Sequence, residues 1–499
     1  MQKVLCVKQV ASSIVLIVTF TFLRKKQPTK GETAMSKNLR EFLNKIKDTI
    51  PSGYLEVDKE IDAKFELCAL LQHLENEKRF PTVVFKNVRN LKGDGGHAVV
   101  SNLFATRENL AIAVDLPKEK WRGELTQEVY RRIKNPVIPK VVGENEAPVK
   151  SNKIIGDDVD IRNLPIIRHH EMDAAPYFTM AIVAKHPEWG IAPGIHNVSF
   201  HRMQYKSPRE TGIHMSPLHT WHIFRSYEER NLPCPIALII GHHPMFYVGA
   251  NMNPAAGVSE YDLVGGLLGE PLRVTPSTTL GSDFLIPADA EFVIEGEILP
   301  NIREAEAPFG EWTRYYGPQR DNPKIKIKAI NHKRDPIFLN VFIGHRDSDY
   351  LGLGWECTVF KRVEEAVPTL HEVYLPPSAC GGYHAYIKIK KTVHGQPINA
   401  ALAALTWGFL KLVVVVDEDI DIFDEEQVWW AVATRVQAGK QVQILKGIRG
   451  SILDPSIGET VEHDAVIIDA TKPLGLPFEE KIRVPKEYMD KIKLRDFIE

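Results

Sequence analysis

The chain has 499 residues, of which 44% are hydrophobic, and this is typical of two or three folded domains rather than of a disordered protein. Lysine and arginine together number 62 and aspartate and glutamate 64, so the net charge gives no reason to expect nucleic-acid binding. The five cysteines show no CxxC spacing, which argues against a disulfide framework or a cysteine zinc site and predicts a reducing compartment, the cytoplasm.

Residues 1–34 differ in character from the rest of the chain. They contain the apolar run VASSIVLIVTFTFL, which is shorter than the roughly 20 residues of a membrane span and lacks a following A-x-A cleavage site. We interpret this leader as an incorrectly assigned start, with a weak membrane anchor as the alternative. The folded protein is expected to begin near Met35, where the next segment predicts an amphipathic helix. Its apolar positions at helical spacing are Leu39, Phe42, Leu43, Ile46 and Ile50.

Three regions with different patterns follow the leader. Residues 35–150 combine helical spacing with short apolar runs such as TVVFKNV and predict an N-terminal α/β domain, which ends near the polar segment 143–152. Residues 151–343 contain many short β-like runs separated by Gly/Pro turns, and they predict a barrel-like β domain. Residues 344–499 alternate helices and strands, and the run Leu412–Val416 predicts a buried parallel strand of a third, α/β domain.

The segment GIHNVSFHRMQ places polar residues inside a predicted strand. Asn197 and Ser199 share one face, whereas Arg202 falls on the other face unless the strand bulges or ends. A buried arginine would need a phosphate or carboxylate partner. An edge strand with a solvated polar face is the alternative.

Several histidines and acids have more than one interpretation. His219 and His222 in SPLHTWH have the i, i+3 spacing of a metal pair but also that of ordinary helix histidines. Glu260 follows a Gly/Pro/Ala loop that could approach a ligand, or it opens an ordinary helix capped by Ser259. The adjacent pairs 169–170 and 242–243 are interpreted as structural. The acidic run 417–426 is expected to cover a strand end and a helix N-terminus.

The segment EAPFGEW holds two glutamates five positions apart. Pro308 disfavours a helix, and in a strand Glu306 and Glu311 would point to opposite faces. A bent loop could instead bring both carboxylates to one point, where they would need a cation or a shared proton. An acidic surface turn is the alternative.

Taken in chain order, the patterns N-x-S-x-x-R, P-x-H-x-W, G-V-x-E and E-x-P-F-G-E resemble the UbiD-type decarboxylases, which use prenylated flavin mononucleotide (FMN). The resemblance covers nearly all of residues 36–499. It implies a multidomain α+β fold with an N-terminal α/β unit, a split β-barrel that binds the flavin, and a C-terminal α/β domain that mediates a homodimer or higher homo-oligomer.

The resemblance also implies a reaction, the reversible non-oxidative decarboxylation of an α,β-unsaturated or (hetero)aromatic carboxylic acid through a covalent adduct of cofactor and substrate. Arg202, Glu306 and Glu311 match the catalytic set: Arg202 would keep Glu306 ionised and Glu311 would donate the proton. A flavin prenyltransferase would supply the cofactor.

The implied ligand residues follow from the same motifs. Asn197, His219 and Glu260 would hold manganese or magnesium against the cofactor phosphate. Carbonyls of Ala250 and Met252 would share a potassium ion with Glu260. The full cofactor-binding set is Thr179, Asn197, Val198, Ser199, Phe200, His201, Arg202, Leu218, His219, Met252 and Glu260. The lysine that some members place on the phosphate has no clear match within residues 400–410.

Four other functions are considered from the sequence. A plain FMN oxidoreductase would not need the Arg-Glu-Glu set, and a non-catalytic subunit of a multi-subunit aromatic carboxylase would be expected to lose part of it; a carboxylating subunit of such a complex is also open. A metal hydrolase would need more histidines at ligand spacing than the chain offers. His345, Arg346 and the loop 449–456 come from regions that could face the substrate.

Overall fold

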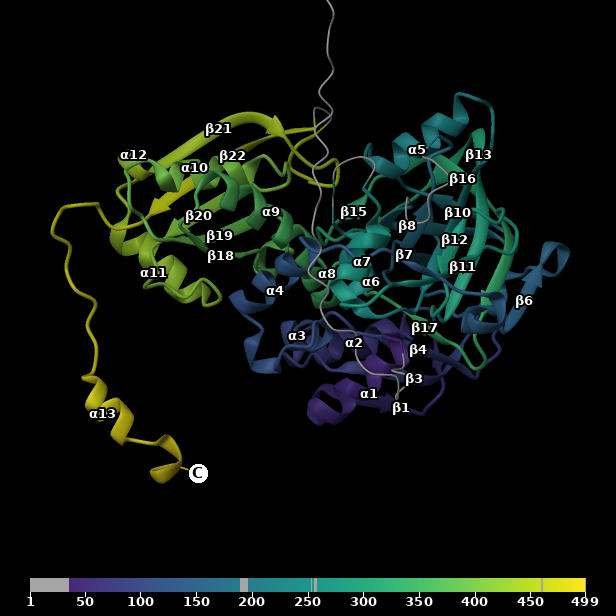
Figure 1. Ribbon diagram of the computed structural model, residues 1–499, viewed down its shortest axis with the longest axis horizontal. Helices are drawn as coiled ribbons and strands as arrows, with labels where there is room; N and C mark the ends of the chain where they lie inside the picture. Colours follow the sequence, from purple (N-terminus) through teal and green to yellow (C-terminus); the bar gives the residue numbers. More distant parts are fainter. Residues whose placement is uncertain (1–35, 189–195, 253, 255–257, 459–460, 499) are drawn as a thin grey trace, which may run out of the picture. The chain divides into compact units, whose positions relative to one another are not determined.

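The computed structural model describes residues 36–188, 196–252, 254, 258–458 and 461–498. The expectation for the leader, residues 1–34, lies outside these ranges. Within them, no helix combines the length and the apolar character needed to cross a lipid bilayer. The described chain forms three modules, each built around its own sheet (Figure 1).

The N-terminal module is a mixed sheet in the order β1-β3-β4-β17, with β2 paired to β3. Its first helix, α1, is the one that the apolar spacing predicts: Asn38 caps it, its apolar face is buried and it ends before Ile50. The last strand comes from beyond the barrel in the sequence. The elements are α1 (Leu39–Thr49), β1 (Tyr54–Val57), β2 (Ile61–Asp62), α2 (Glu66–Asn76), β3 (Thr82–Arg89), β4 (His97–Ser101), α3 (Arg107–Ala113), α4 (Gly123–Ile133) and β17 (Ile337–Leu339).

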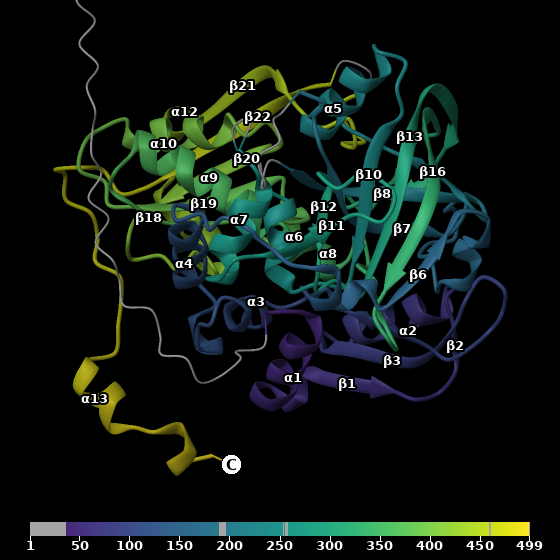
Figure 2. The ribbon, with the colours of Figure 1, turned by 45° about the vertical axis from the view of Figure 1, so that its right-hand side comes forward.

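The central module is a closed barrel of six strands in the order β13-β10-β7-β8-β9-β16, and β16 pairs with β13 to complete the ring (Figure 2). The expected barrel is therefore confirmed. Its strands are β7 (Tyr177–Ala184), β8 (Asn197–Ser207), β9 (Glu210–Ile213), β10 (Cys234–Ile240), β13 (Phe292–Glu306) and β16 (Arg320–His332). Around them lie β5 (Lys140–Val141), β6 (Asn152–Ile155), β11 (Arg273–Pro276), β12 (Leu285–Pro287), β14 (Phe309–Gly310), β15 (Tyr316–Gly317), α5 (His219–Glu228), α6 (Pro244–Ala250) and α7 (Glu260–Leu268).

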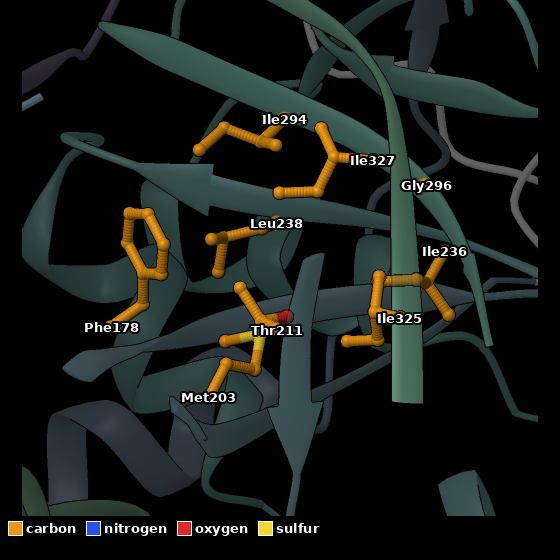
Figure 3. A pocket seen from close by; sticks show the side chains of 9 residues that line it. All are labelled: Phe178, Met203, Thr211, Ile236, Leu238, Ile294, Gly296, Ile325 and Ile327. Atoms are coloured by element: carbon orange, nitrogen blue, oxygen red, sulfur yellow. The ribbon is translucent and has the colours of Figure 1, made fainter. Parts of the chain in front are cut away.

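The inside of the barrel is a packed core rather than a binding chamber. Side chains from all six strands converge there and leave a cavity of only about 10 Å³ (Figure 3). That volume holds one water molecule at most. The residues that line it are Phe178, Met203, Thr211, Ile236, Leu238, Ile294, Gly296, Ile325 and Ile327. A ligand as large as a flavin therefore has to bind outside the ring of strands.

The C-terminal module is a sheet in the order β18-β19-β20-β22-β21, in which β19, β20 and β22 are parallel. The run Leu412–Val416 is the predicted buried strand β20. Val413 and Val415 pack with α9 and α10, whereas Val414 and Val416 pack with α11, so both faces are covered. The elements are α8 (Arg346–Leu351), α9 (Leu353–Ala366), β18 (Leu370–Tyr374), β19 (His384–Ile389), α10 (Gln396–Leu405), β20 (Leu412–Val416), α11 (Glu425–Arg435), α12 (Ala438–Gln441), β21 (Val442–Arg449), β22 (Glu462–Ala470) and α13 (Lys486–Lys491).

A buried ion pair joins the N-terminal module to helix α9. The guanidinium of Arg107 donates to both carboxylate oxygens of Glu356, at 3.0 and 3.1 Å, and also to the hydroxyl of Thr126 at 3.1 Å. Both charged side chains are almost completely buried. Such a pair contributes little net stability compared with apolar residues, but a lone buried charge costs several kcal/mol.

We therefore expect Arg107→Ala to destabilise the protein by about 3–5 kcal/mol, because it leaves Glu356 charged and without its cation. The double substitution Arg107→Met with Glu356→Leu should cost less than the single one, since it removes both charges and retains volume. Thermal melting of the three proteins checks this. Equal melting temperatures for the parent and Arg107→Ala would show that the pair does not hold the modules together.

Candidate active site

Strand β8 presents two different chemical faces. It pairs with β7 without a register shift from Asn197, opposite Ala184, to Gln204, opposite Tyr177. Successive side chains therefore alternate, and Arg202 lies on the face opposite Asn197 and Ser199, as the sequence predicts. The bulge that would have changed this arrangement is absent from this part of the strand.

The Asn197 face forms a polar cluster with the start of α5. The amide of Asn197 donates to the hydroxyl of Thr220 at 3.0 Å, and Ser199 lies within hydrogen-bond distance of both Thr220 and the ring of His201. His201 is half-buried, and its partial removal from water lowers its pKa to about 4, so its ring is neutral near pH 7. This face offers hydroxyl, amide and imidazole groups but no fixed charge.

The Arg202 face carries the charged centre of the site. The guanidinium donates to Glu306 through two parallel hydrogen bonds of 3.0 and 2.9 Å, and its remaining nitrogen pairs with Glu311. The three side chains are 6%, 0% and 7% exposed, respectively. Asn322 donates a further bond of 2.9 Å to Glu306. One cation therefore compensates two buried carboxylates, and the alternative of an acidic surface turn is wrong.

The path of the chain explains how two glutamates in EAPFGEW reach one point. Glu306 is the last residue of β13, and Ala307 then adopts a positive φ of 81°. The short pair β14–β15 turns the chain back, so Glu311 approaches Arg202 from another side. Gly317 packs closely here, since a Cβ on it would lie 2.9 Å from a carboxylate oxygen of Glu311. The predicted bent loop is confirmed.

The three predicted metal ligands each open an element of secondary structure. Asn197 begins β8, His219 begins α5 and Glu260 begins α7. Both helix starts contact the start of β8: Thr220 bonds to Asn197, and a carboxylate oxygen of Glu260 accepts the N–H of Val198 at 3.1 Å. Amide, imidazole and carboxylate donors around one strand end suit a hard divalent ion such as Mn²⁺ or Mg²⁺.

The burial and hydrogen bonds of Glu260 indicate whether a cation fits this site. Its side chain is 2% exposed, and burial raises its pKa to about 8. No described cationic side chain forms a salt bridge with it, and its hydrogen bonds come from the backbone, including the N–H of Val198. A divalent ion would supply the missing positive charge. Burial also lowers the pKa of His219, which favours the neutral imidazole that a metal needs. The residues present therefore fit a bound cation.

The remaining predicted cofactor residues surround the same strand. Thr179 lies opposite Arg202 on β7 and donates to the carbonyl of Val341 at 3.2 Å. Ala250 and Met252 are buried at and after the end of α6, and Leu218 is the partly exposed N-cap residue of α5. Ser259 caps α7, so the helix-start interpretation of Glu260 is confirmed, and the ligand interpretation stays a prediction. Residues 253 and 255–257, in the loop before Glu260, lie outside the described ranges.

Other residues singled out from the sequence have structural partners. His345 bonds to Glu75, and Arg346 packs against Phe80 and Tyr350. Lys411, which follows the stretch without a clear phosphate lysine, pairs with Asp454 of the loop 449–456. His242 and His243 are buried, and the acidic run 417–426 supplies Asp424, the cap of α11, and the acidic first turn of that helix, as expected.

Sequence reasoning missed some residues that complete the site. Asn322 lies on β16 with no motif around it, and only the closed barrel brings it to Glu306. Trp312 directly follows Glu311, and its ring contacts Trp355 and Tyr383 of the C-terminal module. The sequence signal for Trp312 is its position directly after the catalytic candidate Glu311.

Comparison with known proteins identifies the family. Three family models match in chain order: the N-terminal domain (residues 52–129), the Rift-related domain (140–346) and the C-terminal domain (350–470) of 3-octaprenyl-4-hydroxybenzoate carboxy-lyase, UbiD. The chain is 32% identical over 460 residues to phenolic acid decarboxylase of Sedimentibacter hydroxybenzoicus, covering 88% of this chain and 92% of that protein. It is 30% identical over 440 residues to anhydromevalonate phosphate decarboxylase of Methanothermobacter thermautotrophicus, covering 88% and 97%.

The solved structures that match this chain include UbiD-class enzymes. The UbiD-class enzyme HmfF from Pelotomaculum thermopropionicum, in complex with FMN, superposes with a TM-score of 0.84 at 38% identity, covering 92% of this chain and all of that one. An evolved dimeric form of HmfF was solved in complex with prenylated FMN and superposes with a TM-score of 0.81 at 36% identity, covering 93% of this chain and all of that one. Vanillic acid decarboxylase of S. hydroxybenzoicus in its closed form gives 0.80 at 30% identity, covering 92% and 98%.

The pKa of Glu260 predicts how the cation site responds to pH. The affinity of the flavin-free protein for Mn²⁺ should strengthen as pH rises and should level off only above about pH 8, because Glu260 must lose its proton to bind the ion. Calorimetric titration at several pH values measures this. Glu260→Gln should bind weakly with no such pH dependence, and His222→Ala, on the same helix, should behave like the parent. An affinity of the parent that is independent of pH between about 6 and 8 would contradict the assignment.

Proposed function

The chain belongs to the UbiD family of carboxy-lyases, and on this premise we propose that it uses prenylated FMN to decarboxylate an α,β-unsaturated or (hetero)aromatic carboxylic acid, reversibly and without net oxidation. The observation that carries the proposal is the single guanidinium of Arg202 between the buried Glu306 and Glu311. The named decarboxylases among the relatives, and the FMN and prenylated FMN complexes of HmfF, support the reaction type and the cofactor.

The residues around β8 suit such a cofactor. Because the inside of the barrel is filled, the flavin would bind outside it, along the segment Asn197–Arg202 and beside His219. A cation held by Asn197, His219 and Glu260 would offset the charge of the cofactor phosphate, and carbonyls of Ala250 and Met252 would hold potassium with Glu260. When bound, prenylated FMN supplies an electrophilic electron sink for the electron pair that carbon dioxide leaves behind.

The side chains of the Arg202 face would control the proton that replaces carbon dioxide. Arg202 stabilises the ionised form of Glu306 through two charge-assisted hydrogen bonds, and the amide of Asn322 fixes the orientation of that carboxylate. Glu311, held at the third guanidinium nitrogen, donates a proton to the substrate carbon and regains one from solvent. The reaction consumes one substrate carboxylate and one proton, and it yields carbon dioxide and a product with a new C–H bond.

We also propose a source for the cofactor and a cell compartment for the protein. A separate flavin prenyltransferase would supply the cofactor. The described cysteines Cys68, Cys234, Cys357 and Cys380 are all free thiols, which suits a reducing compartment, and we propose the cytoplasm.

Large apolar side chains are exposed on α11, at Trp429 and Trp430, and along residues 476–498. These surfaces support a homo-oligomer assembled through the C-terminal module.

Three other functions make different predictions. A plain FMN oxidoreductase would purify with unmodified flavin and would not depend on the Arg-Glu-Glu set. A non-catalytic subunit would release no carbon dioxide alone, and the presence of all three catalytic candidates argues against it. A carboxylating subunit would run the same chemistry in reverse at high carbon dioxide concentration.

The direct test of the proposed function is to produce the chain together with a flavin prenyltransferase. The absorbance spectrum and mass of the bound cofactor would be measured, and carbon dioxide release would be assayed over a panel of aromatic, heteroaromatic and acrylic acids. We expect prenylated FMN and release from at least one class of acid. Unmodified FMN with no release from any acid, in protein supplied with the prenylated cofactor, would reject the proposal.

Glu311→Gln should retain the fold and the cofactor but should lose about 100-fold or more of the turnover, because the change is nearly isosteric and removes only proton transfer. The rate of carbon dioxide release per bound cofactor measures this. Glu365→Gln, at an exposed position on α9, is the matched control and should behave like the parent. Turnover of Glu311→Gln within twofold of the parent would remove Glu311 from the mechanism.

A further inference from the structure

The loop that carries both glutamates, residues 306–317, is held by a segment that the proposed mechanism does not use, residues 168–177. We infer that Asp173 of this segment is a positioning residue that fixes the loop and thereby the placement of Glu311 against Arg202. This inference rests on the proposed function. It assigns Asp173 no contact with substrate or cofactor.

The carboxylate of Asp173 accepts one backbone hydrogen bond from each side. One oxygen accepts the N–H of Gly310 at 2.9 Å, and the other accepts the N–H of His170 at 2.8 Å. The side chain of Asp173 is completely buried. Gly310 directly precedes Glu311, so this bond fixes the peptide unit between Phe309 and Gly310, one residue before the proton donor. Hydrogen bonds to an ionised acceptor are about twice as strong as neutral ones.

Other contacts from the same segment hold the flanks of the loop. The N–H of Ala174 and the hydroxyl of Tyr177 both donate to the carbonyl of Pro308, at 3.0 and 3.3 Å. The ring of Tyr177 packs on Phe309 with 4.5 Å between centroids, and Phe309 lies beneath the guanidinium of Arg202. Asp173 is the member of this group that bonds the residue next to Glu311.

Gly310 shows how closely the segment and the loop approach each other. A Cβ on Gly310 would lie 2.3 Å from Nδ1 of His170 and 2.8 Å from its Cε1. No side chain fits there unless the ring of His170 moves. The glycine in EAPFGEW is therefore explained by contact with His170, and a larger residue would push the loop away from Asp173.

The same residues have a second interpretation as a metal site. His169, His170 and Asp173 offer ligand atoms within 4.8 Å of one another, the one such group of three among the described residues. Both oxygens of Asp173 already accept backbone N–H groups, however, and one ring nitrogen of His169 bonds Asn340 at 2.7 Å. These bonds favour the positioning role, and metal content distinguishes the two.

Asp173→Asn tests the inference, since it retains the shape of the side chain but turns an N–H₂ group towards one of the two backbone donors. We expect kcat to fall about 10- to 100-fold with little change in KM or bound cofactor, and the pH–rate profile to shift because Glu311 is no longer held against Arg202. The matched control is Asp424→Asn, which alters a backbone cap on α11 far along the chain and should leave kcat and the profile unchanged.

Two further measurements keep the result independent of activity and of folding. Hydrogen exchange across residues 306–317 should be faster in Asp173→Asn than in the parent, and this readout holds even if the proposed reaction is wrong. Gly310→Ala should lose activity, and His170→Ala in the same chain should restore part of it. Unchanged kcat and exchange, or a loss explained wholly by lost cofactor, would overturn the inference. A stoichiometric metal ion in the parent that Asp173→Asn lacks would overturn it as well.

Discussion

One guanidinium between two buried carboxylates is the constraint on which the site depends. Removing charged groups from water is costly unless each is paired, so two buried carboxyl groups that share one guanidinium need further hydrogen-bond donors. Asn322 adds one to Glu306. The unbroken register of β8 places the side chains of Arg202 and Asn197 on opposite faces of the strand, so the Arg202–Glu306–Glu311 group and the candidate cation site lie on opposite sides of it.

The three modules contribute to this arrangement in different ways. The filled barrel supplies a rigid strand rather than a chamber, so ligands are left to its outer surface. The C-terminal module reaches the glutamate loop through Trp312, whose ring contacts Trp355 and Tyr383. Arg107 and Glu356 tie that module to the N-terminal one.

Much of the fold follows from local patterns in the sequence. The helical spacing from Leu39 to Ile46 and the continuous run Leu412–Val416 each identify an element and its buried faces, because periodicity reports local geometry. Local patterns do not predict contacts between segments that are distant in the sequence. That residues 337–339 complete the N-terminal sheet, or that β16 closes the barrel onto β13, depends on pairings that no local pattern encodes.

The same limit applies to the site. The alternation along β8 predicts that Arg202 and Asn197 diverge, and the chemistry of EAPFGEW predicts that its two acids need a cation. The family motifs connect these segments. Asn322 and Asp173 carry no such signal, since an isolated Asn or Asp in a strand or loop is usually a solvated residue or a cap. Their roles become visible only when the chain is folded and their hydrogen bonds to Glu306 and Gly310 can be seen.

The pH dependence of carbon dioxide release by Arg202→Lys, loaded with prenylated cofactor, tests the central claim most directly. An ammonium cannot reproduce the two parallel bonds to Glu306 while also pairing with Glu311. The carboxylates would then share a proton as a coupled pair, so activity should fall at least about tenfold and the acidic limb of the profile should move to higher pH. Parent-level activity with an unchanged profile would contradict the account, because Arg202 would then not be the cation that keeps these two glutamates in their separate roles.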